Sequence, residues 1–538
     1  MSSRVQNIYN LPIGWVWFTL DEGTHKITDG SHNPPTKESS GIPMLSAQNI
    51  TNNHISFENV RYISNDDYIN EYERANVEAG DVLLTIVGSI GRVAFVHDAL
   101  KQKFAIQRSV ALIKPSAFFN GRFLMYAIQA PFFQKQLEEN AKGTAQKGVY
   151  LGVLKTFSVP LAPLNEQHQI VNKIEEIFSE IDHVETALFS IKRQLNFYWQ
   201  TILNNAFCGN ISKEYQTATP KGKSSKSLYS LYEIPIEWKW SELGIHTDFV
   251  GAGSTPKGGR SIYVNSGIPF IRSQNVLNYS LSLNDIAYIT DTINEKMFRT
   301  QTQTSDVLLN ITGASIGRSA YIPENFAQAN VNQHVCIIRT NPSLFYKYLS
   351  LFLNSPTIQR LIQEWSSGAT REALTLSQIR SIPIPICSIE EQKYIVAELE
   401  SQHTIIEHIR NSIEMMIAQI QILKQSVLNK AFEGRLVPQN SSDESASELL
   451  KKIKTERIEY LQNKSKEKKV KIKIKKMERT KSVFDLLKEA QKPVSAKEVW
   501  QQSKHWESID DFYAELKSIS DSVEQTKSKT EILLSLKK

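Results

Sequence analysis

Two long stretches of the chain place apolar residues at alternating steps of four and three positions. The first series runs through Ile170, Ile174, Ile177, Ile181, Val184, Leu188, Ile191 and Leu195. The second runs through Ile395, Leu399, Gln402, Ile406, Ile409, Ile413, Met416, Ile420, Leu423 and Val427, with Gln402 as its one polar member. This stepping is typical of a coiled-coil seam. Since a single rod cannot bury its own seam, we predict two long helices that pack antiparallel on each other.

The chain before each of these stretches has a different pattern, in which short apolar runs alternate with turns rich in Gly, Pro and Asn. Val82–Val87 and Val110–Ile113 have the composition of β-strands, and residues 122–139 have that of a helix. Each such region therefore predicts a globular domain that mixes helices and strands.

The two halves of the chain also repeat each other at an offset close to 225 residues. The matching segments are Leu11–Trp17 with Ile234–Trp240, Gly41–Asn49 with Gly267–Asn275, Ser89–Arg92 with Ser315–Arg318, and Glu166–Gln167 with Glu391–Gln392. An offset this constant over separate segments indicates duplication of one domain and one helix. The predicted fold class is α/β, in its α+β form. The predicted parts are a globular domain at 1–160, a spacer helix at 161–210, a linker at 211–232, a second globular domain at 233–385, a second spacer helix at 386–436, a helix and Lys-rich linker at 437–481, and a small helical C-terminal module at 482–538.

Composition is that of a folded protein, with 41% apolar and 22% charged residues in a chain of 538, enough for several domains. No apolar run approaches the ~18–20 residues of a membrane span, and the N-terminus lacks a signal-peptide core, so we expect a cytoplasmic protein. The three cysteines form no C-x-x-C pair, which supports neither a disulfide framework nor a zinc knuckle.

The net charge of +6 is unevenly distributed. Residues 451–481 contain fourteen Lys and Arg against four Glu, a net of +10, so the other 507 residues carry a net of −4. Bulk charge therefore does not predict nucleic-acid binding, and only the organisation of the chain can indicate it.

The Pro-rich approach to each long helix, Pro160–Val171 and Pro383–Val396, together with two domains and two rods, resembles the specificity subunit of type I restriction-modification systems. The resemblance covers about residues 8–437. It implies two target recognition domains, each reading one half of a split, asymmetric site on double-stranded DNA. It also implies that the helices dock modification (methyltransferase) subunits, two in number, to which restriction subunits add.

The resemblance assigns methylation and cleavage to these partners, so we expect no catalytic residue, cofactor or metal in this chain, and S-adenosylmethionine, ATP and Mg on the partner subunits. The chain itself contains no P-loop spacing and no Gly-rich dinucleotide fingerprint. Asn33-Pro34-Pro35-Thr36 approaches the Asn-Pro-Pro-aromatic motif of amino-methyltransferases, but Thr36 offers no aromatic face for a flipped adenine. A turn is the simpler interpretation.

Base edges and phosphates are contacted by Arg, Lys, Asn, Gln, Ser and Thr, so we expect the DNA-binding residues in loops at matching places of both domains. In the first domain the candidates are Thr28, Gly30, His32, Gln48, Asn49, Arg92, Arg108, Thr144, Gln146 and Lys147. In the second they are Thr255, Lys257, Arg260, Arg272, Gln274, Asn275, Arg318, Gln333, Thr370 and Arg371. The competing interpretations are solvated loops and, for the amides, capping of a turn. The candidate partner-helix seam is Ile170, Ile174, Ile177, Ile181, Ile395, Leu399, Ile406 and Ile409.

Two other functions stay open. A stand-alone methyltransferase or nuclease with duplicated specificity domains would methylate target DNA from S-adenosylmethionine without a partner. A coiled-coil scaffold that binds only proteins would show no salt-dependent shift of duplex DNA.

Overall fold

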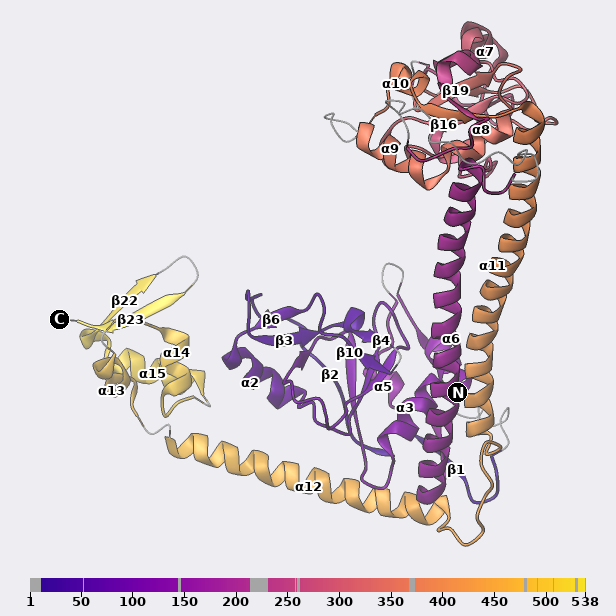
Figure 1. Cartoon of the computed structure of the whole chain (residues 1–538). Coiled ribbons are helices and arrows are strands. Elements are labelled where there is room, and N and C mark those ends of the chain that lie inside the picture. The colour runs from indigo at the N-terminus through magenta and orange to yellow at the C-terminus, as the bar shows by residue number, and fades with distance from the viewer. Residues whose placement is uncertain are drawn as a thin grey trace. The chain divides into compact units, whose positions relative to one another are not determined.

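The computed structural model (Figure 1) describes residues 11–51, 53–143, 147–212, 231–256, 258, 262–366, 373–478, 481–490, 492–506, 508–527 and 531–537, with side chains throughout except at 467–478. The chain divides into two compact units. Unit one comprises Met1–Glu180 and Gln421–Lys538, and unit two comprises Ile181–Ile420. Each unit therefore contains one globular domain and segments of both long helices.

The first globular domain is built on a four-stranded antiparallel sheet in the order β2-β10-β7-β8, formed by Thr24–Asp29, Val110–Pro115, Val82–Thr85 and Val93–Phe95. The central strands β10 and β7 are buried along almost their whole length, which matches their apolar sequences. Helix α3 (Gly121–Gln129) packs against this sheet and precedes α4 (Pro131–Asn140). Asn120 caps α3 because its side-chain oxygen accepts from the backbone N–H groups of Arg122 and Phe123.

Smaller elements complete this domain. They are the sheet β6-β3-β9 (Arg61–Ile63, Ile42–Leu45, Ala105–Ile106), the hairpin β4-β5 (Ile50–Thr51, His54–Ile55), η1 (Ala47–Asn49), α2 (Asn65–Arg74) and α5 (Leu151–Leu154). The antiparallel pair β1-β11 (Val16–Thr19, Ser158–Leu161) brings the beginning and the end of the domain together.

The second globular domain repeats the same plan. Its four-stranded sheet is β13-β19-β16-β17 (Thr247–Ala252, Val335–Thr340, Val307–Asn310, Ser319–Tyr321), and its three-stranded sheet is β15-β14-β18 (Ala287–Ile289, Ile268–Ile271, Asn330–Val331). The closing pair is β12-β20 (Lys239–Glu242, Pro383–Ile386), and the other elements are η3 (Leu243–His246), η5 (Ser273–Asn275), α7 (Asp291–Lys296), η6 (Phe298–Thr300), η7 (Gly313–Ser315), α8 (Tyr346–Leu353), α9 (Pro356–Ser366) and α10 (Leu376–Arg380).

Register confirms the predicted tandem repeat. Trp17 lies opposite Pro160 in the first closing pair, and Trp240 lies opposite Pro385 in the second. In both three-stranded sheets the middle strand is antiparallel to one neighbour and parallel to the other. The predicted helix at 122–139 is two helices, α3 and α4, because Pro131 begins a new helix after Ala130 adopts extended backbone angles.

The two predicted rods are α6 (Leu164–Phe207) and α11 (Ile389–Phe432), each 44 residues long. Within unit two they run antiparallel, because contacts pair rising numbers on α6 with falling numbers on α11. Lys192 forms an ion pair with Glu414, the Arg410 guanidinium donates to the Asn196 amide oxygen over 2.8 Å, and the Trp199 and His403 rings lie 4.9 Å apart. The prediction of antiparallel packing is confirmed there.

The seam residues of the two rods are not all buried. Ile170, Ile174, Ile395 and Leu399, near the helix starts, are fully buried, and the last two belong to the apolar core of the second domain. Farther along, Ile181, Leu188, Ile406, Ile413 and Ile420 are buried at intervals of seven, whereas Val184, Ile191, Ile409, Met416 and Leu423 are exposed. Half of the seam in the middle of the rods therefore faces away from the helix pair.

The chain beyond the repeat differs from the prediction in two ways. Helix α12 (Ala446–Glu478) continues through the Lys-rich stretch predicted as a linker, because that stretch contains neither Gly nor Pro. The C-terminal module contains helices α13 (Val483–Glu489), α14 (Ala496–Gln502) and α15 (Ile509–Ser518), but also η8 (Ser520–Ser522) and the antiparallel sheet β21-β23-β22 (Val494–Ser495, Ile532–Leu536, Val523–Lys527). The purely helical prediction missed these strands because they are short.

The module has an apolar core of its own, in which Val499, Phe512, Leu516 and Leu534 are buried. Among the described helices of the whole chain, none combines the length and the apolar character that crossing a bilayer requires.

Candidate nucleic-acid interface

Five loops of the first domain meet at one end of its four-stranded sheet, where β2 and β7 end and β10 and β8 begin. The loop after β2 joins the loop before β10, since Ser31 donates its N–H to the Ile106 carbonyl over 3.0 Å and receives the Arg108 N–H over 2.9 Å. The loop after β3 joins them through the Ala47 N–H, which donates to Ser109 Oγ over 3.0 Å. The Gly88 N–H donates to the Lys147 carbonyl over 3.2 Å. This bond joins the loop after β7 to the loop that contains Lys147. We call this surface the first rim.

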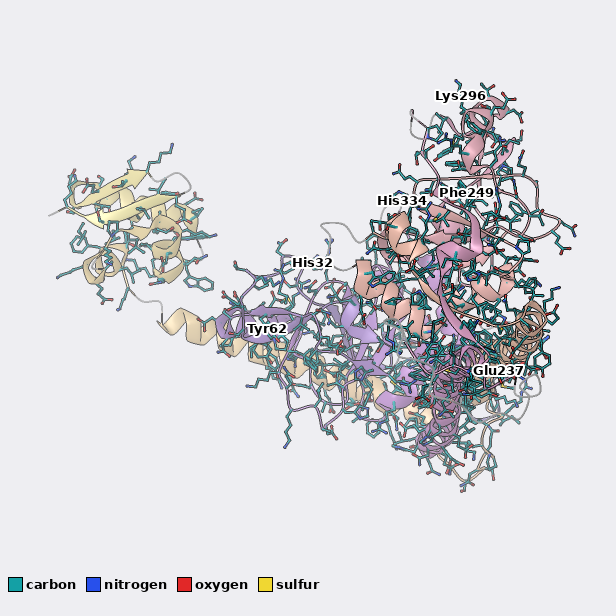
Figure 2. The ribbon with its side chains drawn as sticks, turned by 45° about the horizontal axis from the view of Figure 1, so that its top comes forward. His32, Tyr62, Glu237, Phe249, Lys296 and His334 are labelled. Atoms are coloured by element: carbon teal, nitrogen blue, oxygen red, sulfur yellow. The ribbon has the colours of Figure 1, made fainter. Side chains whose placement is uncertain are left out.

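The equivalent loops of the second domain form a second rim. The Gly253 N–H donates to the Val335 carbonyl over 3.1 Å, and the Ile311 N–H donates to the His334 carbonyl over 3.0 Å. The Asn310 amide donates to the Ser273 carbonyl over 2.8 Å, and the Thr312 hydroxyl is hydrogen-bonded to His334 Nδ1. Figure 2 labels His32 of the first rim and His334 of the second. Loops that match between the two halves of the sequence therefore meet at the same end of the sheet in each domain.

The predicted site residues divide into three groups. Thr144, Gln146, Lys257, Arg260, Thr370 and Arg371 lie outside the described residues. The exposed members on the rims are His32, Gln48, Arg92, Arg108, Lys147, Thr255, Gln274, Arg318 and Gln333, and Thr28 is half-buried. The remaining members are Gly30, Asn49, Arg272 and Asn275, which are buried or engaged within their own domains.

Gly30 and its counterpart Gly253 serve the packing of the loops. A Cβ atom on Gly30 would lie 1.9 Å from the Ile106 carbonyl oxygen, and one on Gly253 would lie 2.0 Å from that of Val331. The close backbone approach that the glycine allows is therefore to the domain's own chain. Contact with DNA, for which Gly30 was a candidate, is not needed to explain these two glycines.

Asn49 and Asn275 cap the short helices η1 and η5. The Asn49 side-chain oxygen accepts from the Ser46 N–H over 3.0 Å, and the Asn275 oxygen accepts from the Arg272 N–H at the same distance. Their amide nitrogens donate to the carbonyls of Glu58 and Ser282. The Arg272 guanidinium donates to the Asp285 carbonyl. These three side chains therefore hold the shape of their own loops.

Sequence reasoning missed Tyr150, an exposed aromatic side chain beside the first rim. Val149 is buried and donates its N–H to the Ile86 carbonyl at the end of β7, so the next residue in the extended chain points outward. Tyr150 is 71% exposed. In the sequence, Tyr150 could be noticed as an aromatic residue next to the Lys147 loop. Only the burial of Val149 shows that Tyr150, and not Val149, faces solvent.

The Glu-Gln pair that opens each long helix has a structural role. The Trp15 indole nitrogen donates to Glu166 over 2.9 Å, and that of Trp238 donates to Glu391 over 3.1 Å. Gln167 accepts the Asn120 N–H and donates to the Ala162 carbonyl, and Gln392 makes the same two bonds with Phe345 and Cys387. This pair therefore fastens each domain to the start of its helix.

A buried carboxylate lies at the other end of each four-stranded sheet. Asp81 is 2.8 Å from the Lys114 ammonium nitrogen, and its counterpart Asp306 receives two hydrogen bonds from the Arg339 guanidinium at 2.7 and 2.8 Å. Burial raises the pKa of Asp81 to about 6, although the hydrogen bond and charge of Lys114 oppose that rise. Because an equivalent pair occurs in both domains away from the rims, we interpret it as structural.

A second candidate surface follows the exposed half of the seam in unit two. Its seam members are Val184 and Ile191 on α6 and Ile409 and Met416 on α11, each at least 40% exposed. Exposed large apolar side chains that follow one line along a helix mark a site of protein contact. Among the described residues no cluster of His, Cys, Asp and Glu has the arrangement of a metal site.

Two mixed α/β domains with equivalent loop rims, each fastened to a shared pair of helices, define a tandem recognition protein. The sequence matches the family described as type I restriction modification DNA specificity domain over residues 12–193 and again over 235–415. Together these segments cover more than half of the chain. The chain belongs to this family and contains its DNA specificity domain twice.

Individual relatives agree with this assignment. The type I restriction enzyme EcoBI specificity subunit of Escherichia coli is 29% identical, over 63% of this chain and 72% of that one. The EcoKI specificity subunit of Escherichia coli is 20% identical, over 77% of this chain and 89% of its own length. A solved structure concerned with complex assembly and conformational transition of the type I R-M system has a TM-score of 0.59 at 20% identity, covers 79% of this chain and 100% of that chain, and supports the fold.

Proposed function

We propose that this chain selects the DNA target of a type I restriction-modification complex, with each recognition domain reading one half of a split duplex site. The observation that carries the proposal is the convergence of separate loops on equivalent rims, which expose Arg92 and Arg108 in the first domain and Arg318 in the second. Exposed guanidinium groups suit phosphates and guanine edges. Since the proposed ligand is DNA, the cytoplasm remains our expectation for its location.

The two rims differ at positions that the shared framework places equivalently. Arg108 corresponds to Gln333, and His32 corresponds to Thr255. Different side chains present different donors and acceptors to the base edges. We therefore propose two different half-sites and an asymmetric target.

The chain would supply recognition and assembly, and its partners the chemistry. We propose that the exposed seam on α6 and α11 docks two modification subunits, to which restriction subunits add. S-adenosylmethionine, ATP and Mg²⁺ would then be bound by those partners. Co-expression with the modification subunits of the same system should give a stable complex that methylates a single asymmetric sequence, and this chain alone should transfer no methyl group.

Two findings would contradict this assignment. Methylation of target DNA by the isolated chain would favour a stand-alone enzyme. A complex whose methylation pattern stays the same when one recognition domain is exchanged with that of a relative would favour a scaffold without a role in reading.

Arg92→Gln with Arg108→Gln in one chain tests the first rim. If both groups contact phosphate, the slope of log K against log salt should fall by about 1.8, and affinity at low salt should drop substantially. Lys101→Gln with Lys103→Gln is the matched control, because these exposed lysines lie in the loop that follows β8 at the other end of the sheet. Equal slopes for both double variants would remove the first rim from the interface.

A further inference from the structure

Helix α12, which lies beyond the residues matched by the family, packs along the first recognition domain. Ala446, Leu449 and Ile453 are buried on one helix face. Glu456, Arg457 and Tyr460 follow Ile453 at spacings of three, four and seven residues, so they lie on the same helix face. The contacts of α12 are concentrated on β2, which pairs with β10 alone among the strands that the structure describes.

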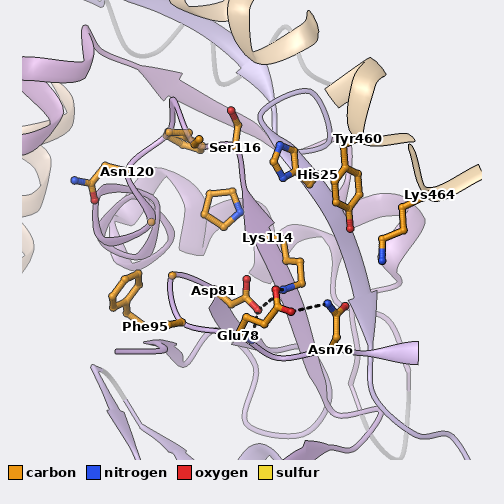
Figure 3. A pocket seen from close by; sticks show the side chains of 16 residues that line it. His25, Asn76, Glu78, Asp81, Phe95, Lys114, Ser116, Asn120, Tyr460 and Lys464 are labelled. Carbon is orange, nitrogen blue, oxygen red and sulfur yellow. Dashed lines mark hydrogen bonds and ion pairs between the residues drawn. The ribbon is translucent and has the colours of Figure 1, made fainter. Parts of the chain in front are cut away.

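Polar groups fix the register of this contact. Glu456 accepts from the Ser116 hydroxyl and from the Ala117 N–H, and its carboxylate lies 3.3 Å from His25 Nε2. The His25 ring stacks on the Tyr460 ring at 4.7 Å with an interplanar angle of 10°. Figure 3 shows these two rings side by side at the wall of a cavity of about 540 Å³, with Lys464 from the same helix.

Two ion pairs lie beside these contacts. Arg457 is 2.5 Å from the Asp21 carboxylate, and Lys454 is 2.9 Å from that of Glu22. All four side chains are partly exposed, so each pair adds little stability by itself. The two ion pairs instead specify position, because together with the Glu456 contacts they can all form in only one placement of α12 along β2.

The second recognition domain lacks the partners of α12. At the positions of Asp21, Glu22 and His25 it has Gly244, Ile245 and Asp248. Ile245 is 67% exposed, and Asp248 would repel the carboxylate of Glu456. The docking surface is therefore a property of the first domain, although the two frameworks repeat.

The strand under α12 leads directly to the first rim. β2 begins at Thr24, beside His25, and ends at Asp29, whose carboxylate binds both His32 on the rim loop at 2.7 Å and Arg74 at 2.9 Å. We propose that α12 is a positioning element for the first recognition domain. The helix holds the edge strand β2 in place and thereby increases discrimination against mismatches in the first half-site. This proposal rests on the function proposed above for the rims.

The test uses the full chain in complex with its modification subunits. Ile453→Glu places a charge in the buried contact, and Ile458→Glu is the matched control because Ile458 is 57% exposed on the same helix. We expect Ile453→Glu to lower discrimination against mismatches in the first half-site by about tenfold, with the second half-site unchanged. Ile458→Glu should leave both unchanged.

A charge exchange separates positioning from general destabilisation. Arg457→Glu should weaken first-half discrimination several-fold, and Arg457→Glu with Asp21→Arg should restore it. Hydrogen exchange along β2 in the DNA-free chain should rise and fall with the same variants. Unchanged β2 exchange in Ile453→Glu, equal losses at both half-sites, or no rescue by the exchange would overturn the proposal. A wild-type complex without preference for any duplex sequence would instead overturn the proposed function of the rims.

Discussion

Glu391 receives the Trp238 indole N–H in the second domain just as Glu166 receives that of Trp15 in the first. These residues are identical between the halves, and they fasten domains to helices. His32 and Arg108, by contrast, correspond to Thr255 and Gln333, and they lie on the rims. At the residue scale, the halves therefore share the residues that fasten the framework and some rim residues, such as Arg92 and Arg318, and the differences at other rim positions mark the proposed reading of different half-sites.

Tyr150 gives a residue-scale prediction for the first rim. An exposed aromatic ring can stack on a base or wedge between base pairs, which is worth about 1–3 kcal/mol per base for stacking. Tyr150→Ala should weaken binding of the cognate duplex about tenfold or more, and Tyr150→Phe should retain most of it. The measurement is equilibrium binding by the complex, with mismatches in the second half-site as the internal control. Equal affinities for Ala and wild type would place Tyr150 away from the DNA.

Asp81 gives a prediction about pH. Its carboxyl has an ordinary pKa of 3.8 in the unfolded chain and one of about 6 in the folded domain, so the folded state binds the proton more tightly. That contribution to stability is complete below pH 4 and is lost as pH rises through 6, by up to about 3 kcal/mol. Hydrogen exchange at β7 should therefore become faster between pH 4 and 6, after correction for the intrinsic rate. Asp81→Asn should abolish this change, and an identical pH profile in the variant would contradict the assignment.

At the scale of elements, the long helices perform two tasks along different parts of their length. Near their starts, Ile170 and Ile395 are fully buried, and Ile395 belongs to the core of the second domain. In their middle, every second seam residue is buried and the alternate ones are exposed. Two helices bury a narrow line of contact between them, so the exposed line can take further helices without disturbing the pair.

Val184 and Gln200 test this division of tasks on α6. Val184 is a seam residue that is 53% exposed, and Gln200 is an exposed polar residue outside the seam on the same helix. Val184→Glu should reduce co-purification of the modification subunits at least tenfold while leaving helical content and thermal unfolding unchanged. Gln200→Glu should have no such effect. Full recovery of the complex with Val184→Glu would remove the exposed seam from the docking site.

At the scale of the whole molecule, each unit combines one recognition domain with segments of both helices. Neither domain is therefore an appendage of one rod. The repeat stops at α12, which docks on partners present only in the first domain. The molecule is consequently asymmetric in two respects, the loops of its rims and the support of its first domain.

Helix length should set the distance between the proposed half-sites. Removing one heptad from each rod, residues 184–190 of α6 and 409–415 of α11, preserves the seven-residue interval of buried positions and shortens each helix by about 10 Å. The tolerated spacer between half-sites should then shorten by about three base pairs, with the half-site sequences unchanged. Methylation mapped on a library of spacer lengths measures this. An unchanged spacer preference would contradict the role of the helices as a ruler.

Periodicity and repetition were sufficient to predict the tandem α/β domains, the long helices and their antiparallel packing. Those features depend on which residues avoid water, and that information is local in sequence. Exposed candidates such as Gln48, Arg92 and Arg318 also lie on the rims. The role of Asn49 and Asn275 is not encoded locally, because an amide in a loop has the same sequence pattern whether it faces solvent or caps a turn.

What the sequence determined by itself was therefore the order of elements, the duplication and the absence of familiar catalytic motifs. Tertiary structure decided which loops share a rim, that Gly30 admits the Ile106 carbonyl, and that Tyr150 is exposed because Val149 is buried. It also decided that α12 belongs to the first domain. The reason is physical: burial and hydrogen bonding at these places depend on residues far apart in the sequence, such as Ile86 with Val149 and Asp21 with Arg457, and no local pattern records such pairings.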